Sequence, residues 1–552
     1  MVDLLDPKLV VRLAERFGDE AYFAAICVRA GLVGIEPPHR VLRHLVSLER
    51  YGMIGGVLPV SAARHSDRLA VVDERGELSY KELDERTNAL ANAWRERGLK
   101  PGEGVTVLVR NHRGFLDAVF AAAKCGSRVI LLNTSFAGPQ IREVAGREGT
   151  DLLVYDDEYT DTLEGIDPPR GRWRAWADEP GEDTIDALIE DGDASGPPRP
   201  GNAPKFTILT SGTTGSPKGA ARSSPRSLSL VGGLLSKVPY RAGSEVTELS
   251  VPMFHALGFM QLVMGLALGS TLVLRRRFDP EETLDSIERH KVTSMVAVPV
   301  MLRRIVDLGE DAISQRDTSS LKIIFVSGSA LGADLAQRTL ERFGPVVYNL
   351  YGSTEIAYAT IATPEDLRTE PGTAGKIVRG SIVKILDDDG NEKPTGETGR
   401  VFVGNSSQFE GYTGGGSKEE VGGLLSSGDV GHFDDEGRLF IDGRDDEMIV
   451  SGGENVFPAE VEELLGSHES IEEAAAVGVD DEKFGQRLKA FVVLRDGAEL
   501  SEDEIKGYVK DNLARYKVPR EVAFVDELPR NQTGKVIKRE LVEKESVEQE
   551  SA

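Results

Sequence analysis

Short apolar runs, typical of buried strands, alternate with stretches whose apolar residues keep helical spacing. Ser79 and Glu82 form the capping box of one predicted helix, which continues to Arg97. The same patterns predict strands at 105–109, 128–132, 205–210, 247–251, 292–298, 322–326 and 346–350, and helices at 115–124, 280–290 and 333–343. Repeated strand–helix units predict mostly parallel, doubly wound sheets. In such sheets, ligands bind at loops beyond the carboxyl ends of the strands.

Other regions depart from this alternation. Residues 1–50 look like a helical extension interrupted at Pro37 and Pro38, and the acidic, Gly- and Pro-rich stretch 178–204 is interpreted as a surface linker. After Arg444, short strands and two helices, 458–465 and 502–513, predict a small α+β domain. We therefore expect an α/β protein with a helical extension (1–50), a large domain of doubly wound sheets (51–444), a small C-terminal domain (445–540) joined by a hinge, and a charged tail (541–552).

Composition and charge exclude several classes of protein. The 552-residue chain has 65 lysines and arginines against 91 aspartates and glutamates, a formal net charge of −26. Nucleic-acid binders carry a basic footprint, so we expect no nucleic-acid partner. Two cysteines, Cys27 and Cys125, exclude a disulfide scaffold and a cysteine-based zinc site.

We also expect a cytoplasmic protein. Asp3 and Asp6 stand where a secretory signal carries basic residues. The uncharged stretch 256–274 contains Gln261, and we interpret it as a buried helix (259–268) followed by a strand (270–274) rather than as a membrane span. The apolar extension has three interpretations: packing on the large domain, which we favour, peripheral contact with the inner face of the membrane, or self-association. Nothing in the sequence indicates an oligomeric state.

One loop that directly follows a predicted strand combines hydroxyls, glycines and a lysine: Thr210, Ser211, Gly212, Thr213, Thr214, Gly215, Ser216, Pro217, Lys218 and Gly219. Glycine allows close backbone approach, hydroxyls donate to phosphate oxygens, and lysine supplies a point charge. We interpret the loop as a cradle for the polyphosphate of a nucleotide. It is not a Walker A loop, because Pro217 and Gly219 flank the lysine. An ordinary flexible loop is the alternative.

Further polar motifs are weak one by one. Glu355, beside hydroxyls at a strand end, suits Mg²⁺, and Tyr351 suits stacking on a base. Asp429 lies between glycines and could accept hydrogen bonds from ribose hydroxyls, although such an Asp usually bonds its own backbone. Lys535 lies beside Gly534 in a polar loop, where a solvated surface lysine is the commoner case.

Together, the order and spacing of these motifs resemble the adenylate-forming superfamily, which includes acyl-CoA synthetases, firefly luciferase and peptide-synthetase adenylation domains. The resemblance runs from about Gly56 to Leu541. It implies a two-domain enzyme that uses ATP, Mg²⁺ and coenzyme A. A carboxylate first attacks the α-phosphate of ATP and gives an acyl-adenylate. The small domain then rotates, and a thiol displaces AMP.

The resemblance also implies roles in the first half-reaction. The loop 210–219 would hold the β- and γ-phosphates, with Lys218 as its cation. Glu355 would bind Mg²⁺, and Thr354 the α-phosphate. Lys535 would bridge the substrate carboxylate and the α-phosphate in this step only.

Other roles concern the nucleoside and the second step. Tyr351 would stack on adenine beside the loop of Gly328, Ser329 and Ala330. Asp429 and Arg444 would bind the ribose. Asp446 matches the hinge, and Gly452 and Gly453 would line the pantetheine tunnel. The departures are mild: Ser427 stands where relatives often have Thr, and the Gly-rich segment 414–425 lacks the usual Trp.

The acid to be activated is inferred from the segment 252–258, in which His255 and Gly258 resemble the family's gate to the acyl pocket. No acidic residue occurs between His255 and Leu274, which disfavours an amino acid, because its ammonium group would be left unpaired. Small residues (Ala357, Ala359) and an apolar gate helix indicate a dry, narrow pocket.

We therefore expect a medium- or long-chain fatty acid as substrate. The segments 403–405 and 409–413 also resemble bacterial fatty-acyl-CoA synthetases. Aryl acids, an acyl-AMP ligase that loads a carrier protein, a luciferase-like oxygenase and a non-catalytic binding protein are the alternatives.

Overall fold

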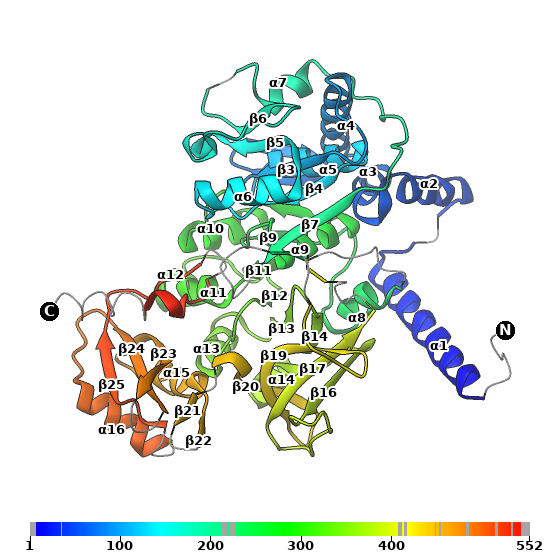
Figure 1. The fold of residues 1–552 in the computed structure, drawn as a ribbon. Coiled ribbons are helices and arrows are strands. Elements are labelled where there is room, and N and C mark those ends of the chain that lie inside the picture. Colours follow the sequence, from blue (N-terminus) through cyan, green and yellow to red (C-terminus); the bar gives the residue numbers. More distant parts are fainter. Residues whose placement is uncertain are drawn as a thin grey trace. The chain divides into compact units, whose positions relative to one another are not determined.

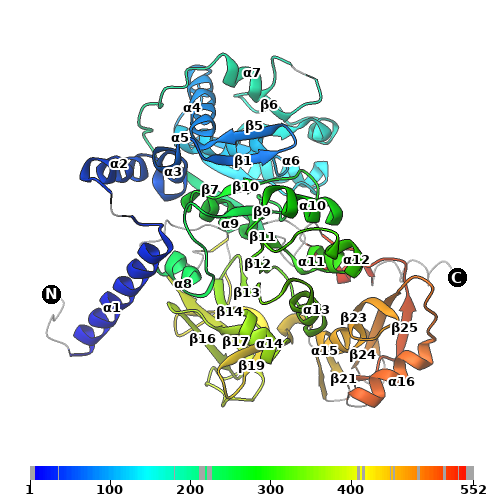
Figure 2. The same cartoon turned by 180° about the vertical axis from the view of Figure 1, so that it is seen from behind.

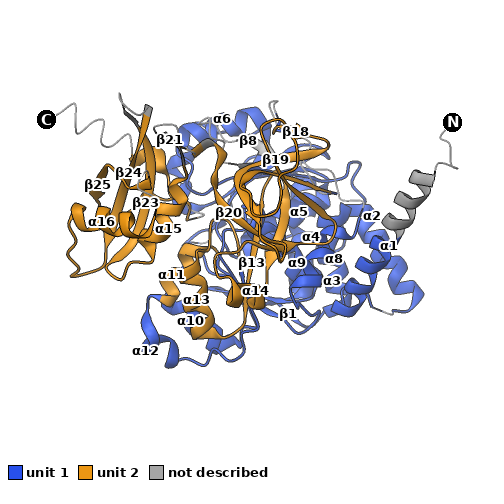
Figure 3. Cartoon of the chain, turned by 90° about the horizontal axis from the view of Figure 1, so that it is seen from below, with its two compact units in different colours: residues 1–297, 307–325, 406–417 blue, residues 298–306, 326–405, 418–552 orange. Residues whose placement is uncertain are grey.

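The computed structural model describes residues 7–541 except 35, 180, 211–217, 221–226, 407–410, 413–416, 448, 452–453, 482–484, 514–516 and 532–533 (Figure 1). The chain divides into two compact units (Figure 3). Unit 1 contains residues 1–297, 307–325 and 406–417. Unit 2 contains residues 298–306, 326–405 and 418–552.

The predicted extension is helical and breaks before Pro38, as α1 (Pro7–Ala30), α2 (Pro38–Gly55) and α3 (Val57–His65). Helix α1 packs against α8 (Ser229–Lys237), where Phe23 is buried against Gly232. This contact confirms that the extension packs on the rest of the chain. Helix α2 continues past residue 50, the expected end of the extension.

The first sheet of unit 1 has parallel neighbours throughout except for the hairpin β7–β8. Its order is β6 (Arg172–Trp176), β5 (Thr150–Asp156), β3 (Gly104–Leu108), β4 (Arg128–Leu131), β7 (Lys205–Thr210) and β8 (Lys218–Ala220). Its helices are α4 (Tyr80–Glu96), α5 (Arg113–Cys125) and α6 (Gly138–Glu148), with the short turns η1 (Asp157–Tyr159) and η2 (Asp161–Leu163). The predicted capping box of Ser79 and Glu82 begins α4.

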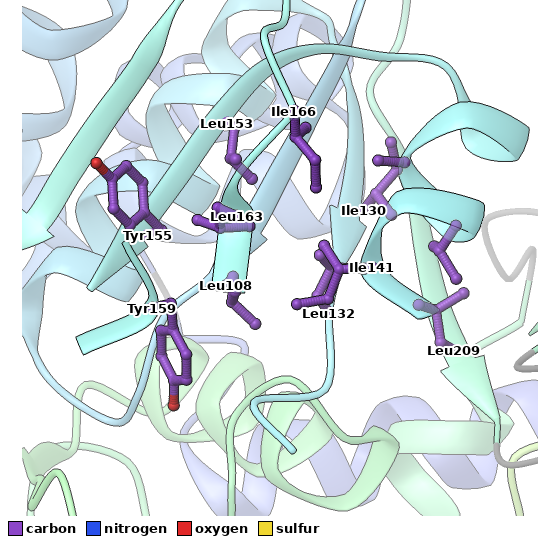
Figure 4. Close-up of a cluster of buried hydrophobic side chains, with 12 residues drawn as sticks. Leu108, Ile130, Leu132, Ile141, Leu153, Tyr155, Tyr159, Leu163, Ile166 and Leu209 are labelled. Atoms are coloured by element: carbon purple, nitrogen blue, oxygen red, sulfur yellow. The ribbon is translucent and has the colours of Figure 1, made fainter. Parts of the chain in front are cut away.

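Apolar side chains from four strands of this sheet meet those of α6 in a buried cluster (Figure 4). The cluster contains Leu108, Ile130, Leu132, Ile141, Val144, Ala145, Leu153, Tyr155, Tyr159, Leu163, Ile166 and Leu209. It buries one face of the parallel strands, as the continuous apolar runs predict.

The second set of strands in unit 1 is also mainly parallel. The order is β12 (Ile323–Val326), β11 (Ser294–Ala297), β9 (Val246–Leu249), β10 (Thr271–Val273), β1 (Leu69–Asp73) and β2 (Gly76–Ser79). The neighbours from β11 to β1 pair parallel, whereas β2 pairs antiparallel with β1. The associated helices are α9 (Ala256–Ala267), α10 (Pro280–His290) and α12 (Gly309–Ser314). Thus the uncharged stretch is a helix followed by a strand, as predicted. Among the described residues, no helix is both long enough and apolar enough to cross a membrane.

The stretch 178–204 is not a linker throughout, and that prediction is wrong at α7 (Ile185–Glu190). Thr184 caps this helix by accepting a hydrogen bond from the backbone N–H of Ala187 at 3.2 Å. Ile185 and Leu188 are buried. A cap and two apolar side chains therefore outweigh the polar composition of the surrounding sequence.

The doubly wound prediction fails in unit 2, where the strands of residues 347–444 pair antiparallel. Their order is β16 (Ser381–Leu386), β17 (Gly399–Asn405), β19 (Leu424–Phe433), β20 (Arg438–Arg444), β15 (Gly375–Ile377), β14 (Ala357–Ala362) and β13 (Val347–Ser353), with β18 (Glu420–Val421) beside β19. The helices here are α11 (Pro299–Val306), α13 (Ala333–Phe343) and α14 (Pro364–Thr369). A parallel crossover needs about a dozen residues. The short turn between β13 and β14 leaves no room for one.

The rest of unit 2 confirms the small α+β arrangement predicted after Arg444. Its strands are β21 (Ile449–Ser451), β22 (Glu454–Val456), β23 (Ile471–Asp481), β24 (Gly485–Leu494) and β25 (Glu521–Phe524), preceded by the turn η3 (Asp445–Glu447). Helices α15 (Pro458–Gly466) and α16 (Glu502–Asn512) bury apolar side chains in the same core. The capping box of Ser501 and Glu504 begins α16, as predicted. The expected boundaries, 445–540, stay a prediction.

Glu248 on β9 provides a pH test of the unit 1 core. Burial raises the pKa of this carboxyl to about 7, although Ser286 Oγ donates a hydrogen bond to it at 2.6 Å. The folded state therefore binds the proton more tightly than the unfolded chain, and stability falls as the pH rises from about 4.5 to 7, by up to about 3 kcal/mol. We expect Glu248→Gln to raise the melting temperature at pH 8 and to change it little at pH 5. The exposed Glu77→Gln is the control, and an equal effect of Glu248→Gln at both pH values would contradict this account.

Candidate active site

Asp429 is the centre of a group of three predicted site residues in unit 2. It lies opposite Arg444 on the neighbouring strand, and Arg444 Nη1 donates to Asp429 Oδ1 at 3.1 Å. From β13, the Tyr351 hydroxyl donates to Asp429 Oδ2 at 2.5 Å. Burial, and then the neighbouring Asp429 carboxylate, raise the pKa of Tyr351 well above its usual value. The hydroxyl therefore remains a donor, and the structure brings together the residues expected around the nucleoside.

Gly428 allows two cations to approach the backbone beside Asp429. Its φ is +82°, and a Cβ atom placed there would lie 3.2 Å from Arg444 Nη2 and 3.3 Å from Lys418 Nζ. Sequence reasoning missed Lys418, which lies in the stretch that departs from the family pattern. Two cations beside an anionic group suit a phosphate-bearing ligand.

The turn between β13 and β14 carries Thr354 and Glu355. Ser353 Oγ donates to Glu355 Oε2 at 2.8 Å and accepts from the Glu355 backbone N–H at 3.2 Å. Ala357 has a φ of +60°, and a Cβ on Gly352 would lie 2.2 Å from the Ala357 carbonyl oxygen. Such strain in a non-glycine residue persists where the surroundings fix the backbone, and it clusters at functional sites.

Asn405 on β17 is one of the residues that fix this turn. Its Nδ2 donates to the carbonyl oxygens of Ile356 at 2.7 Å and Tyr358 at 3.1 Å. Sequence reasoning noted Asn405 only for its resemblance to fatty-acyl-CoA synthetases. Its contacts indicate a positioning role for the loop that carries Glu355.

Glu355 fits a magnesium ion that is shared with phosphates. The described residues contain no group of three or more His, Cys, Asp or Glu side chains that could hold a metal. Mg²⁺ often takes only one or two protein carboxylates and completes its shell with phosphate oxygens and water. A single carboxylate at a strained turn therefore fits such an ion, whereas an all-protein metal cage does not.

Lys535 lies at the tip of a short, internally bonded loop. Asn531 Oδ1 accepts from the Lys535 backbone N–H at 2.9 Å, and the Asn531 backbone N–H donates to the Lys535 carbonyl, also at 2.9 Å. Arg530 beside it pairs with Glu473 on β23 at 2.7 Å. Lys535 itself is exposed. The backbone of the loop is thus fixed while the ammonium group reaches solvent.

Gly534 brings this loop against the start of α11. A Cβ on Gly534 would lie 2.1 Å from Val300 Cγ1 and 3.5 Å from Val298 Cγ2. On the other side of Val298, a Cβ on Gly328 would lie 3.3 Å from Val298 Cγ1. Val298 therefore lies between the Lys535 loop and the loop expected beside adenine (328–330), whose residues are exposed. Valine is not a residue type that indicates binding or catalysis, so sequence reasoning missed both residues.

The backbone of the expected hinge residue, Asp446, lies in the turn η3. The neighbouring Asp445 accepts from Arg400 Nε at 3.0 Å, and Glu447 pairs with Lys538 at 2.7 Å. Lys538 also pairs with Glu462 at 2.8 Å. Burial alone would lower the pKa of Lys538, but the two carboxylates outweigh it and hold that pKa above its usual value. Ion pairs thus flank the hinge on both sides.

In unit 1, His255 immediately precedes α9. Burial lowers the pKa of His255 to about 4, so the ring is neutral at pH 7. Its ring lies 4.5 Å from that of Phe254, and its Nε2 is buried with no hydrogen-bond partner among the described residues. A Cβ on Gly258 would lie 2.2 Å from the Pro252 carbonyl oxygen, so only glycine fits there. Asn111, missed by sequence reasoning, anchors this segment by accepting from the Met253 backbone N–H at 2.9 Å.

The gate helix is mainly apolar, as expected, and Gln261 is its polar exception. This side chain of α9 is buried, and its Oε1 accepts from the Tyr240 hydroxyl at 3.2 Å. Its Nε2 is buried without a partner in the described part of the chain. An unpaired buried donor costs about 1–3 kcal/mol. Helix α9 therefore carries a buried polar amide, that of Gln261, within an otherwise apolar sequence.

Several predicted residues lie outside the described parts: Ser211, Gly212, Thr213, Thr214, Gly215, Gly452 and Gly453. The backbone on both sides of the first of these stretches is described, and β7 pairs with β8 so that Thr210 lies opposite Lys218. The loop therefore joins two antiparallel strands, which agrees with its departure from the strand-to-helix Walker A pattern.

Comparisons with known proteins identify the family of the chain. The model of the AMP-binding enzyme family matches residues 58–413, and the model of its C-terminal domain matches residues 460–535. The indoleacetate–CoA ligase of Aromatoleum aromaticum is 33% identical over 484 residues, 84% of this chain and 92% of that protein. The fatty acid–[acyl-carrier-protein] ligase ScoC of Streptomyces coeruleorubidus is 29% identical over 495 residues, 86% of this chain and 92% of that protein.

A solved structure shows the same fold. The o-succinylbenzoate CoA synthetase of Bacillus subtilis, in complex with the acyl-adenylate intermediate OSB-AMP, matches with a TM-score of 0.74 and 27% identity. The match covers 88% of this chain and 97% of that one.

Gly534→Ala tests whether packing on α11 fixes the Lys535 loop. The new Cβ would overlap Val300, and the φ of +75° is unfavourable for alanine by about 1–2 kcal/mol. We expect a melting temperature lower by a few degrees and a large loss of ATP–pyrophosphate exchange, the activity that the family resemblance implies. The control is Gly507→Ala in α16, where a Cβ meets nothing within 4 Å and stability should be unchanged or higher. Full ATP–pyrophosphate exchange activity in Gly534→Ala would show that the packing of the Lys535 loop on α11 is not needed for this activity.

Proposed function

Because the chain belongs to the AMP-binding enzyme family, we propose that it joins a carboxylic acid to coenzyme A in two steps, using ATP. It is an AMP-forming acid–thiol ligase, and its co-substrates are ATP and CoA, with Mg²⁺. The observation that carries the proposal is the hydrogen-bonded group of Tyr351, Asp429 and Arg444, with the turn of Glu355 directly after the strand of Tyr351. These residues would hold the groups that ATP offers: a base, a ribose and a metal-bound phosphate.

In the first step, a carboxylate oxygen of the acid attacks the α-phosphorus of ATP. The phosphorus–oxygen bond to the β-phosphate breaks, and acyl-AMP and pyrophosphate form. Glu355 would hold Mg²⁺, which neutralises phosphate charge, and Thr354 would contact the α-phosphate. Lys218 would bind the outer phosphates, and Lys535 would place its charge between the two reacting anions. Positioning and charge neutralisation account for most of the catalysis in such a step.

In the second step, the thiol of CoA loses its proton, and the sulfur attacks the acyl carbon. The bond to AMP breaks, and a thioester is left. We propose that residues 445–540 rotate about Asp446 between the steps. The ion pair of Asp445 with Arg400 and that of Glu447 with Lys538 support this role, because they fix the backbone on either side of one residue. Gly452 and Gly453 would line the path of the pantetheine arm.

For the acid, we propose an aromatic carboxylic acid that carries a hydrogen-bonding group. The buried, unpartnered Nε2 atoms of His255 and Gln261 support this class, because an alkyl chain would leave both unpaired. The names of the indoleacetate and o-succinylbenzoate enzymes point the same way.

The second candidate is a fatty acid of medium or long chain, the substrate expected from the sequence. This candidate is supported by the similarity to the fatty acid–[acyl-carrier-protein] ligase. Because of the same similarity, a carrier protein stays an alternative to CoA as the acyl acceptor. Each of these reactions consumes ATP, and transfer to CoA also consumes CoA. We therefore propose that the reaction takes place in the cytoplasm.

Lys535→Ala tests the proposed catalysis. Lys535 is exposed, so its loss should leave the melting temperature unchanged. Removing one such electrostatic contact should slow acyl-AMP formation by about 10²–10³-fold. The control is Lys510→Ala, another exposed lysine of unit 2. Acyl-AMP formation that survives undiminished in Lys535→Ala would refute the assigned role.

A panel of acids tests the substrate class. Enzyme, Mg·ATP and CoA are incubated separately with indole-3-acetate, ferulate, o-succinylbenzoate, octanoate and palmitate, and acyl-AMP and acyl-CoA are read by mass spectrometry. We expect an aromatic acid to give the highest kcat/KM, and His255→Phe to reduce its advantage over octanoate, because the ring nitrogen that pairs with the substrate is lost. A preference for palmitate, unaffected by His255→Phe, would favour the fatty acid instead.

A further inference from the structure

Large apolar side chains that remain exposed gather in the extension. Of the eleven such residues among those described, seven fall between residues 28 and 53: Val28, Val33, Val41, Leu42, Leu45, Val46 and Met53. The most exposed is Leu42, at 63%, followed by Leu45, at 57%. Scattered single exposed apolar residues are ordinary, but a concentration of them marks an interaction surface.

The N-terminal half of α2 presents these side chains on one face. Leu42, Leu45, Val46 and Glu49 have the i, i+3, i+4, i+7 spacing of a single helical face. Glu49, the one charged residue of the four, pairs with Arg199. No other described element covers this face, because residues 37–43, 45, 46 and 49 are all exposed.

The C-terminal half of the same helix is anchored in unit 1. Tyr51 is buried, and its hydroxyl donates to the Pro197 carbonyl at 3.1 Å. Beyond a kink at Gly52, whose φ of +74° is not helical, a Cβ on Gly55 would lie 2.8 Å from the Cβ of Ala123 on α5. Figures 1 and 2 show α2 at the periphery of unit 1, beside α3. The exposed half is therefore presented by an anchored helix.

Basic side chains lie in the same part of α2: His39 and Arg43 are at the margin of the apolar face, and Arg40 is on the opposite side of the helix. His39, Arg40 and Arg43 are exposed, and no carboxylate in the described parts of the chain forms an ion pair with either arginine. The chain as a whole carries a net charge of −26, so unpaired arginines on the same helix as an apolar face are a local exception. This combination, an aliphatic face with basic residues elsewhere on the same exposed helix, matches helices that lie in the interface of an anionic bilayer.

We propose that α2 docks this chain on an anionic lipid surface. Leu42, Leu45 and Val46 would enter the boundary between headgroups and acyl chains. Arg43 would pair with lipid phosphates, with its stem along the apolar surface, and the charge of Arg40 would add to the attraction. A second copy of the chain fits less well. A stable protein interface buries about 800 Å² on each partner, over some 20–30 residues. Here, a few turns of one helix carry the apolar surface.

This inference is independent of the proposed reaction. None of the residues involved belongs to the candidate site, so loss of docking should leave the activity on water-soluble acids unchanged. Failure of one proposal can therefore be told from failure of the other.

The test is flotation of the full-length protein with large unilamellar vesicles on a density gradient. One set contains equal parts of phosphatidylglycerol and phosphatidylcholine, and the other contains phosphatidylcholine alone. We expect the protein to bind the anionic vesicles about tenfold more tightly than the neutral ones, and the binding to weaken with added salt. Leu42→Gln/Leu45→Gln should lower the binding to anionic vesicles by at least about tenfold. Arg40→Gln/Arg43→Gln should abolish the preference for the anionic lipid.

Matched controls lie elsewhere on the surface. Ile382→Gln replaces an aliphatic residue that is 55% exposed, and Arg289→Gln removes an exposed arginine. Both should bind vesicles like the parent protein. Circular dichroism melting curves check that every variant is folded.

Three outcomes would overturn the proposal. One is no flotation with either kind of vesicle. Another is binding that the leucine variant leaves unchanged. The third is a dimer in analytical ultracentrifugation that the leucine variant abolishes while vesicle binding is absent, since the face would then serve a second copy.

Discussion

The shared carboxylate of Asp429 is the constraint on which the described site depends. It accepts hydrogen bonds from Tyr351 on β13 and Arg444 on β20 while lying on β19 itself. The turn of Thr354 and Glu355 follows β13 directly, and the hinge turn η3 follows β20 directly. One half-buried network therefore fixes the starting points of both the expected metal-binding turn and the expected hinge. Such networks are stable only when every member is paired.

A second constraint is steric. The absence of a side chain at Gly534 lets the Lys535 loop pack on Val300, and hydrogen bonds from Asn531 fix the loop internally. The ammonium group is left at an exposed tip. In the proposed mechanism, a flexible stem on this fixed backbone would bring its charge to the reacting anions in the first step only. Because the chain is strongly acidic overall, the proposed charge neutralisation would depend on individually placed cations such as this one.

The local features of the fold were predictable because their causes are local. The caps at Ser79 and Ser501 begin α4 and α16, and the residue pattern located Tyr351, Asp429 and Arg444, which the structure brings together. What failed depends on contacts between distant segments. Strands 347–444 pair antiparallel, whereas doubly wound sheets were expected throughout residues 51–444, and Val298 and Val300 are not residue types that mark a site. The fatty-acid expectation, which stays the second candidate, rested on small residues, an apolar gate helix and the resemblance of segments 403–405 and 409–413. That pattern does not reveal that Gln261 is buried with one nitrogen unpaired among the described residues.

The central claim is that the Asp429 group binds the nucleoside, and the most direct measurement is the affinity for AMP, by isothermal titration calorimetry, of the parent protein and of Asp429→Asn. Asparagine keeps the volume and an acceptor oxygen but loses the charge that pairs with Arg444. A hydrogen bond to a charged group is worth about 1.5–3 kcal/mol, so we predict AMP binding weakened by at least about tenfold in a variant that is still folded. Asp435→Asn, at an exposed position, should bind AMP like the parent protein. Equal affinities for AMP in the parent protein and Asp429→Asn would contradict the account.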